Sequence, residues 1–504
     1  TNDLCGTSVG ECEERVTICQ NGAVVCDGNT PPSPEICDDL DNDCDGTVDD
    51  STQGSGQTCG VTDVGPCEYG VTACIDGTME CVGNVDPEPS DVCDGIDNDC
   101  DSTIDVPGCL SVATNDIRLD AATNPGEYNS VQLDMAASGD RIHAVWLDSR
   151  GGYADIYHTC SNDGGATWIT EERLDSGSSD SVKPRVLLDS AGWAYVAYED
   201  FAGTGSRQIF FRRASSCSAG AFSSATRLDA AVAEDSLNID LAADGSGNVF
   251  VTWEDFVEGS GSSDSYRNIF LSASTDYGAT WSSASPVRVN QSPSDPTDAY
   301  ATVPQVAVGS LGRALVVWAD ARNGATDIYF NYTDDAGSTF LASDVMLSSD
   351  SPGANASKFP RLVSDGSGNV VVVWEDLRRG FSDIRYNYSG NNGATWQASD
   401  LWLDSDKGDF SSYEVSVVWG QGNRVHAAWR DFREGLPRVR VATSNDNGAT
   451  FGTGVLASYS PGAATEPQLA ANGSGKVFVA FACDPDGLRA AYGNYPLDNG
   501  FRSG

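Results

Sequence analysis

Ser161-Asn162-Asp163-Gly164-Gly165-Ala166-Thr167-Trp168 is the stretch of this chain that decides its fold. Near-copies of the octad, with the pattern S/T-x-D-x-G-x-T-W/F, return at 274–281, 333–340, 389–396 and 444–451. A motif that returns at a nearly constant period indicates a repeat architecture. A degenerate copy ends at Phe222, and Asn391 replaces the aspartate in the fifth unit, so the motif tolerates change.

A second repeated element precedes each octad. It is a β-branched and aromatic run that ends in an aromatic anchor residue, and the seven anchors lie 52 to 65 residues apart: Trp146, Tyr198, Trp253, Trp318, Trp374, Trp429 and Phe481. Alternating apolar residues and Gly, Asn and Asp turns predict four short strands per unit, in the first unit approximately 131–137, 141–147, 155–159 and 168–174. Four-stranded units at this spacing are typical of propeller blades. The sequence therefore predicts an all-β fold, a seven-bladed β-propeller.

The two ends of the ring are expected to meet in the last blade. Most octads are followed by an outer strand such as Thr226-Arg227-Leu228-Asp229, but the last unit stops a few residues after 498–501 without one. Asp116-Ile117-Arg118-Leu119-Asp120 has the sequence of that strand and precedes the first unit. We therefore expect strand 116–120 to complete the seventh blade.

The octad resembles the Asp-box, or BNR repeat, of sialidase-type β-propellers, and the resemblance covers roughly the last four-fifths of the chain. It implies, as one function, a glycoside hydrolase that clamps an acidic sugar with three arginines and uses a Tyr/Glu pair with an Asp acid/base. Candidates for these roles are Arg185, Arg361, Tyr300, Tyr413 and Glu414. The chain departs from that family in its blade count, since sialidases have six, and in lacking an early Phe-Arg-Ile-Pro tract.

The recurrent polar residues are interpreted as structural. A residue that is repeated around a ring cannot by itself make an asymmetric catalytic site, so the octad aspartates are expected to accept backbone N–H bonds beside a glycine at positive φ. The same reasoning predicts structural pairs in the loops between second and third strands: Asp148/Arg150, Asp320/Arg322, Asp376/Arg378 and Asp431/Arg433. Without a distinctive acid pair, a non-catalytic protein is favoured over an exo-glycosidase of the sialidase type.

The first 110 residues differ in composition from the rest. They hold 13 of the 16 cysteines, 25 acidic residues and one basic residue, Arg15, and so supply 24 of the 45 excess negative charges. Such cysteine density indicates disulfides and an oxidising compartment. We expect a secreted, extracellular or cell-surface protein whose signal peptide has been removed, with no membrane insertion and no nucleic-acid partner, because phosphate would be repelled.

This segment is itself duplicated. The first repeat (1–53) and the second repeat (54–110) precede the propeller region (111–504), and each repeat has six cysteines at nearly the same spacing: Cys5, Cys12, Cys19, Cys26, Cys37 and Cys44, matched by Cys59, Cys67, Cys74, Cys81, Cys93 and Cys100. Three disulfides per repeat are expected, with 15 connectivities open. The four remaining cysteines form, in one possible set of pairs, Cys160–Cys217 and Cys109–Cys483.

Each repeat ends in an acidic loop with hard oxygen ligands at alternating positions. The candidate metal ligands are Asp41, Asp43, Asp45, Thr47 and Asp49 in the first loop and Asp97, Asp99, Asp101, Thr103 and Asp105 in the second, with Gly46 or Ser102 at the sharp turn. This arrangement is typical of an EF-hand-like calcium loop, although neither loop has the glutamate at position 12. The alternatives are copper, for which the segment lacks histidine, and an acidic turn without an ion, which would carry unrelieved repulsion.

The two loops resemble the MopE-type D-x-D-N-D-C-D-G-x-x-D motif of secreted bacterial proteins, which implies a metal site. The sequence therefore predicts a secreted, calcium-binding, non-catalytic protein with two calcium sites. Its role would be adhesion or binding of a glycan or cell-surface ligand, or service as a subunit of an extracellular assembly or filament through self-association of the N-terminal arm. The alternative is a sialidase-like glycoside hydrolase.

Overall fold

The computed structural model divides into two compact units, Thr1–Asn115 and Asp116–Gly504. The structure describes residues 3–28, 30–64, 67–87, 100, 119, 130–176, 178–201, 205–229, 235–256, 266–281, 286–291, 300–404, 410–458, 463–471, 477–484 and 490–493. Among the predicted features, Asp97, Asp99, Asp101, Thr103, Asp105, Cys93, Cys109 and, apart from Leu119, the strand 116–120 lie outside these residues.

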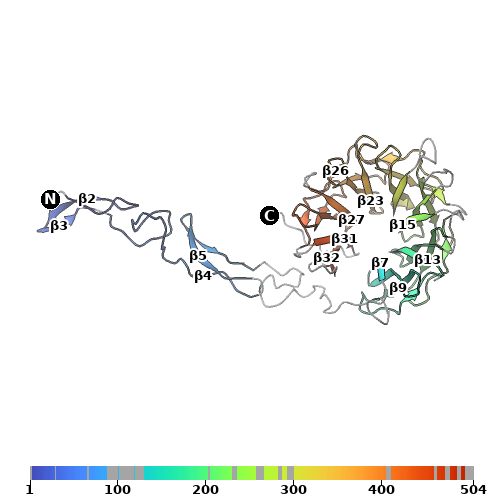
Figure 1. Cartoon of the computed structure of the whole chain (residues 1–504), viewed down its shortest axis with the longest axis horizontal. Coiled ribbons are helices and arrows are strands. Elements are labelled where there is room, and N and C mark those ends of the chain that lie inside the picture. Colours follow the sequence, from blue (N-terminus) through green and yellow to red (C-terminus); the bar gives the residue numbers. More distant parts are fainter. Residues whose placement is uncertain are drawn as a thin grey trace. The chain divides into compact units, whose positions relative to one another are not determined.

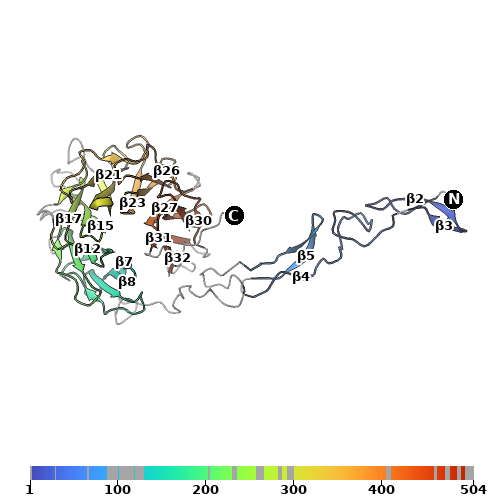
Figure 2. The same ribbon diagram turned by 180° about the vertical axis from the view of Figure 1, so that it is seen from behind.

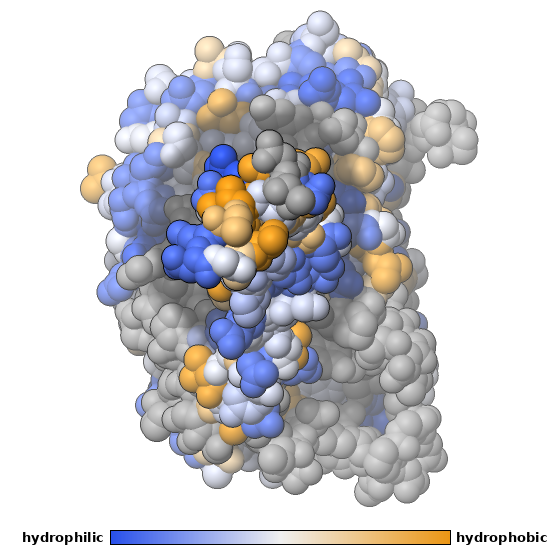
Figure 3. Space-filling model, turned by 90° about the vertical axis from the view of Figure 1, so that its left-hand side faces the viewer, coloured by the Kyte–Doolittle hydropathy of each residue, from blue (hydrophilic) through white to orange (hydrophobic). Residues whose placement is uncertain are grey.

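In its described residues, the N-terminal unit contains two three-stranded antiparallel sheets, one in each repeat. Their strands are β1 (Leu4–Cys5), β2 (Arg15–Gln20) and β3 (Ala23–Cys26), then β4 (Thr58–Cys59), β5 (Gly70–Ile75) and β6 (Thr78–Val82). Few of these positions are buried, and several large hydrophobic side chains remain exposed, among them Leu4, Val24, Val61 and Val71. Figure 3 shows such hydrophobic groups at the surface between hydrophilic ones. With so small a core, covalent links must supply much of the stability.

Five disulfides link the described residues of this unit, and one of them corrects the expectation from sequence. Four lie within a repeat, namely Cys5–Cys26, Cys12–Cys44, Cys59–Cys81 and Cys67–Cys100. The fifth, Cys37–Cys74, joins the acidic loop of the first repeat to strand β5 of the second. The prediction of three disulfides within the first repeat is therefore wrong, because the loop that carries Cys37 packs against the next repeat and not against its own hairpin.

The second unit is built from seven antiparallel sheets in the described residues, which follow one another around a common centre (Figure 1; seen from behind in Figure 2). The first three sheets contain β7 (Ser130–Ser138), β8 (Arg141–Asp148), β9 (Asp155–Ser161) and β10 (Glu172–Arg173); β11 (Ser181–Leu188), β12 (Ala194–Asp200), β13 (Gln208–Ala214) and β14 (Thr226–Arg227); and β15 (Ser236–Ala243), β16 (Val249–Phe256), β17 (Arg267–Ser274) and β18 (Val287–Arg288).

The next three sheets repeat this order, and the seventh has three strands in the described residues. They contain β19 (Ala301–Val308), β20 (Ala314–Asp320), β21 (Asp327–Thr333) and β22 (Val345–Met346); β23 (Ser357–Ser364), β24 (Val370–Asp376), β25 (Asp383–Ser389) and β26 (Leu401–Trp402); β27 (Ser412–Trp419), β28 (Val425–Asp431), β29 (Arg438–Ser444) and β30 (Val455–Leu456); and β31 (Ala463–Ala471), β32 (Val477–Asp484) and β33 (Ala490–Gly493). Apart from the 3-10 turn η2 (Ser310–Gly312), the described residues form no helix, so none of them forms a helix that could cross a membrane.

The core lies between neighbouring sheets. Every aromatic anchor falls on the second strand of its sheet and is at least nine-tenths buried. Each hydrophobic cluster takes side chains from two adjacent sheets, as where Val373 and Tyr386 of the fifth sheet pack with Trp429 and Ala442 of the sixth. Burying one large apolar side chain contributes roughly 1.5–3 kcal/mol, so these clusters hold each sheet to the next.

The octads form the turns between the third and fourth strands. In the octad at 274–281, Asp276 Oδ1 accepts hydrogen bonds from the Ser274 hydroxyl at 2.8 Å and from the Thr280 amide at 2.8 Å, and Oδ2 accepts from the Thr280 hydroxyl at 2.6 Å. Equivalent bonds recur at Asp163, Asp335 and Asp446. These carboxylates are satisfied within the turn, which supports their structural interpretation.

Candidate functional site

The acidic loop of the first repeat is built around two buried carboxylates. Asp41 Oδ1 accepts the Asp45 amide at 3.1 Å, and Oδ2 accepts the Gly46 amide at 3.0 Å. Gly46 has φ +97°, the left-handed conformation that the sequence predicted for a sharp turn. Glu35 spans the loop, accepting the Asp43 amide at 2.5 Å and the Asp49 amide at 3.1 Å. The backbone thus points its amides at the carboxylates and holds them close together.

Two groups of oxygen ligands result from this folding. The carboxylates of Glu35, Asp41 and Asp43 can place one oxygen each within 4.8 Å of one another, and so can those of Asp43, Asp45 and Asp50. Asp43 belongs to both groups, so the two are contiguous. The structure therefore brings together three of the ligands named from sequence, Asp41, Asp43 and Asp45.

The other predicted ligands of this loop lie differently. Both oxygens of Asp49 accept backbone amides, from Asp38 and Asp39, each at 3.0 Å. Thr47 is exposed, and its amide donates to Asp45 Oδ1 at 2.9 Å. Asp49 thus shapes the segment that precedes the acidic loop.

Two candidate ligands were missed from sequence, Glu35 and Asp50. A signal for Glu35 exists, because an acidic residue stands two positions before the fifth cysteine in both repeats, as Glu35 and as Asp91. No such signal marks Asp50, since Val106 stands at its position in the second repeat.

The charge in this loop is unbalanced. Arg15, the one basic residue of the first 110, pairs with Glu13. Burial and the charges of Asp45, Asp43 and Asp41 raise the pKa of Asp50, and Asp50 Oδ1 is inaccessible to solvent with no hydrogen-bond partner among the described residues. A cation bound by these oxygens would satisfy this atom and relieve the repulsion.

The donor atoms match a hard cation. Every candidate ligand of the first loop is an oxygen, the nearby sulfurs of Cys37, Cys74, Cys12 and Cys44 are in disulfides, and the three histidines of the chain all lie beyond residue 110. Copper prefers thiolate, thioether or imidazole ligands, whereas calcium prefers oxygen.

The second unit has a central cavity of about 550 Å³, lined by the first strands of all seven sheets. Each of these strands is irregular at the cavity, with a shift in register and one non-glycine residue at positive φ: Gln132, Lys183, Asn238, Val303, Phe359, Glu414 and Glu466. A bulge removes backbone amides from the ladder, and carboxylates of the preceding sheet accept several of them. Glu254, for example, accepts the amide of Val303 at 2.9 Å.

Both arginines proposed for the hydrolase, Arg185 and Arg361, line this cavity together with Asp134. Although burial opposes its charge, Asp240 and Asp134 raise the pKa of Arg185, whose guanidinium lies 3.1 Å from Asp240. Burial and the charge of Arg185 lower the pKa of Arg361, whose one described hydrogen bond goes to the carbonyl of Pro360. The cavity thus holds two neighbouring guanidiniums, and that of Arg361 forms no ion pair with a described carboxylate.

The other hydrolase candidates do not line the cavity. Glu414 pairs with Arg430 at 2.9 Å, and the ring of Tyr413 packs edge-on against Phe432. Tyr300 packs against Tyr266, with ring centroids 5.6 Å apart. Among the described residues, therefore, no tyrosine joins the two arginines.

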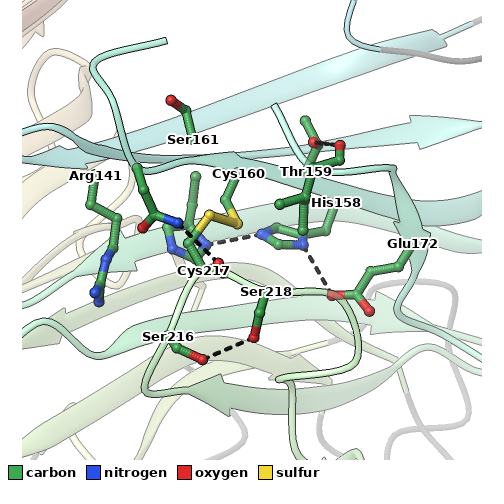
Figure 4. Close-up of a disulfide and its surroundings, with 12 residues drawn as sticks. Arg141, His158, Thr159, Cys160, Ser161, Glu172, Ser216, Cys217 and Ser218 are labelled. Atoms are coloured by element: carbon green, nitrogen blue, oxygen red, sulfur yellow. Dashed lines mark hydrogen bonds and ion pairs between the residues drawn. A yellow bond between two sulfur atoms is a disulfide. The ribbon is translucent and has the colours of Figure 1, made fainter. Parts of the chain in front are cut away.

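A buried polar cluster of the first sheet lies beside the predicted disulfide Cys160–Cys217, which is confirmed (Figure 4). His143 Nδ1 lies 2.9 Å from His158 Nε2, and His158 Nδ1 lies 3.3 Å from Glu172 Oε1. Burial and the neighbouring His158 lower the pKa of His143 to about 3. The histidine is thus a neutral part of the packing between sheets.

Comparison with known proteins identifies a family motif in both acidic loops. The model of the metal-binding motif family named Cu-binding MopE matches residues 26–50 and 83–105. Among curated protein sequences, none matches this chain.

The solved structures similar to the chain include sialidases and polysaccharide lyases. An ulvan lyase of polysaccharide lyase family PL25 is 12% identical, with 72% of this chain and 91% of the lyase covered and a TM-score of 0.45. A Hadza microbial sialidase is 13% identical, with 68% and 74% covered and a TM-score of 0.39. The leech intramolecular trans-sialidase is 13% identical, with 77% and 71% covered and a TM-score of 0.39. The chain thus carries a metal-binding motif and is similar in structure to these enzymes.

Proposed function

We propose that the chain is a secreted, calcium-binding, non-catalytic protein that binds an extracellular ligand or takes part in an extracellular assembly. The observation that carries the proposal is the convergence of Glu35, Asp41, Asp43, Asp45 and Asp50 in the first acidic loop, with no basic residue among its described partners. Calcium fits these oxygens better than copper does. By repetition of the motif, Asp97, Asp99 and Asp101, with Asp91 in the position of Glu35, would hold a second ion.

We further propose that the second unit is a seven-bladed propeller closed by residues 116–120. Its last sheet has three described strands where each of the other six has four, which leaves the outer position for a strand from the start of the unit. A closed ring leaves few strand edges exposed and presents two broad faces, which suits a binding role.

Calcium titration of the full chain tests the proposal. Isothermal titration should give about two calcium ions per chain, and Asp41→Asn with Asp45→Asn should lower this by about one, because both carboxylates belong to the first loop. Asp63→Asn, an exposed acidic residue of the same unit, is the matched control and should leave the stoichiometry unchanged. A stoichiometry unaffected by the loop variant, or copper binding in place of calcium, would contradict the proposal.

The sialidase-like hydrolase has one observation in its favour, the shared cavity of Arg185 and Arg361. Two guanidiniums in one cavity suit a carboxylate or sulfate group of a glycan. A binding protein should retain anionic oligosaccharides on an array without cleaving a fluorogenic sialoside, and Arg361→Met should weaken retention. Turnover of the sialoside that Arg361→Met abolishes would replace the binding function with the hydrolase.

A further inference from the structure

The exposed thiol of Cys19 occupies a position that makes a cross-link in the neighbouring repeat. The two repeats have the same hairpin: Cys19 pairs with Val24 across β2 and β3, as Cys74 pairs with Met79 across β5 and β6. Two disulfides of the first repeat also have counterparts in the second, so these disulfides connect equivalent positions in the two repeats. Cys74 is bonded to Cys37 of the preceding repeat, whereas Cys19 is free.

A second observation also indicates that the first hairpin lacks a partner segment that the second hairpin has. The hairpin turn of the second repeat is covered by the first repeat: a Cβ added to Gly77 would lie 3.0 Å from the Asp39 carboxyl carbon and 3.2 Å from the Asp38 carbonyl carbon. The equivalent glycine, Gly22, also has positive φ, but a Cβ added there would have nothing within 4 Å. The turn that receives a Cys-Asp-Asp segment in one repeat is therefore uncovered in the other.

The segment that docks on the second hairpin is held in shape by its own repeat. The amides of Asp38 and Asp39 donate to the two oxygens of Asp49, each at 3.0 Å, directly after Cys37. The contact is thus made by a preformed loop, and a hairpin of the same kind can receive a loop of the same kind.

We propose that the β2–β3 hairpin is a docking site for the Cys-Asp-Asp loop of a further Cys/Asp repeat, and that Cys19 forms with its cysteine the disulfide that Cys74 forms with Cys37. The two thiols become a disulfide by exchange with a small-molecule disulfide such as oxidised glutathione. The Cys19 thiolate attacks this disulfide and releases one glutathione; the partner thiolate then attacks the mixed disulfide and releases the second, with two thiol protons passing to the released thiolates.

Full chains with one cysteine replaced supply the probe. Cys74→Ser frees Cys37 within its Cys-Asp-Asp loop, whereas Cys37→Ser, the matched control, frees Cys74 on a hairpin. Each variant is mixed with the unaltered chain in a glutathione redox buffer, and disulfide-linked peptides are quantified by mass spectrometry, which also verifies the four disulfides within the repeats.

We expect Cys19–Cys37 links between chains to exceed Cys19–Cys74 links by about tenfold, because docking raises the effective concentration of the matched thiols. Gly22→Asn, which places a side chain where the partner's aspartate would lie and tolerates positive φ, should remove that preference while leaving Cys19 reactive with glutathione. Cys19–Cys37 links formed between copies of the unaltered chain alone would identify a second copy as the source of the loop. Equal yields with both variants, or a preference unchanged by Gly22→Asn, would overturn the proposal.

Discussion

The aspartate of each octad acts through hydrogen bonds that the turn itself supplies. Asp163 and Asp276 show the consequence, since hydrogen bonds from the neighbouring threonine and serine lower the pKa of both to about 2, against the opposing effect of burial. The fifth octad makes the same contacts with an amide: Asn391 Oδ1 accepts the Thr395 amide at 2.9 Å, and Nδ2 donates to the Thr395 hydroxyl at 2.8 Å. The turn therefore requires the shape of the side chain more than its charge.

This difference can be tested at Asp276. Asp276→Ala should destabilise the second unit by about 1 kcal/mol or somewhat more, because the Thr280 amide loses its acceptor. Asp276→Asn is the matched control and should cost clearly less, as the fifth octad already works with asparagine. Tryptophan fluorescence during urea unfolding reports this unit, since every tryptophan lies beyond residue 110. Equal losses for the two variants would show that the octad charge matters more than its hydrogen bonds.

Within a sheet, the predicted Asp–Arg pairs are confirmed, and three of them are extended by a further carboxylate. Arg378 binds Asp376 at 2.6 Å and Asp400, directly before the outer strand β26, at 2.8 Å. Arg322 binds Asp320 and Asp344 in the same way, and Arg150 binds Asp148 and Glu171. These arginines thus join the loop after the second strand to the two-residue outer strand, whose own ladder is too short to hold it.

Removing the shared carboxylate of the fifth sheet should be costly. Asp400 is buried and accepts from Arg378, Arg385 and the Ser349 amide, so Asp400→Asn leaves two mostly buried guanidiniums without their common counter-charge. We expect a loss of about 3–5 kcal/mol in the free energy of unfolding. The control, Asp334→Asn, breaks an equally close pair with Arg313 whose carboxylate is 61% exposed, and should cost at most about 1 kcal/mol. Similar losses at the two sites would refute the role assigned to burial.

At the scale of the whole molecule, two buried neutral histidines make stability depend on pH. Burial and Arg424 lower the pKa of His426 to about 4, and that of His143 is about 3. Both groups take up a proton more readily when unfolded, with an ordinary pKa near 6.5. Their contribution to stability is therefore complete above pH 6.5 and is lost as the pH falls from 6.5 toward 4.

The effect of His426 can be separated from that of other groups. Asp175, whose pKa burial raises to about 6, opposes the histidines in part of this range. His426→Asn keeps a polar group near the Thr443 hydroxyl, which lies 2.9 Å from His426 Nδ1. It should reduce the pH dependence of the unfolding free energy between pH 6.5 and 4.5 by about 1 kcal/mol per pH unit. An unchanged slope in urea unfolding across these pH values would contradict the assignment.

Features that repeat locally could be predicted from the amino-acid sequence. Octads, aromatic anchors and alternating strands follow from side-chain periodicity within a few residues, so the strands of the first sheet and the Asp–Arg pairs could be predicted. The acidic loop was recognised for the same reason, because Asp41, Asp43 and Asp45 alternate along one short segment. Contacts between groups distant in sequence are visible only in the folded chain: Cys37 with Cys74, Glu35 and Asp50 with the acidic loop, and Arg185 with Arg361 in one cavity. Those contacts depend on how repeats and sheets pack against one another. Packing brings together residues that are close in space but have no regular spacing along the chain.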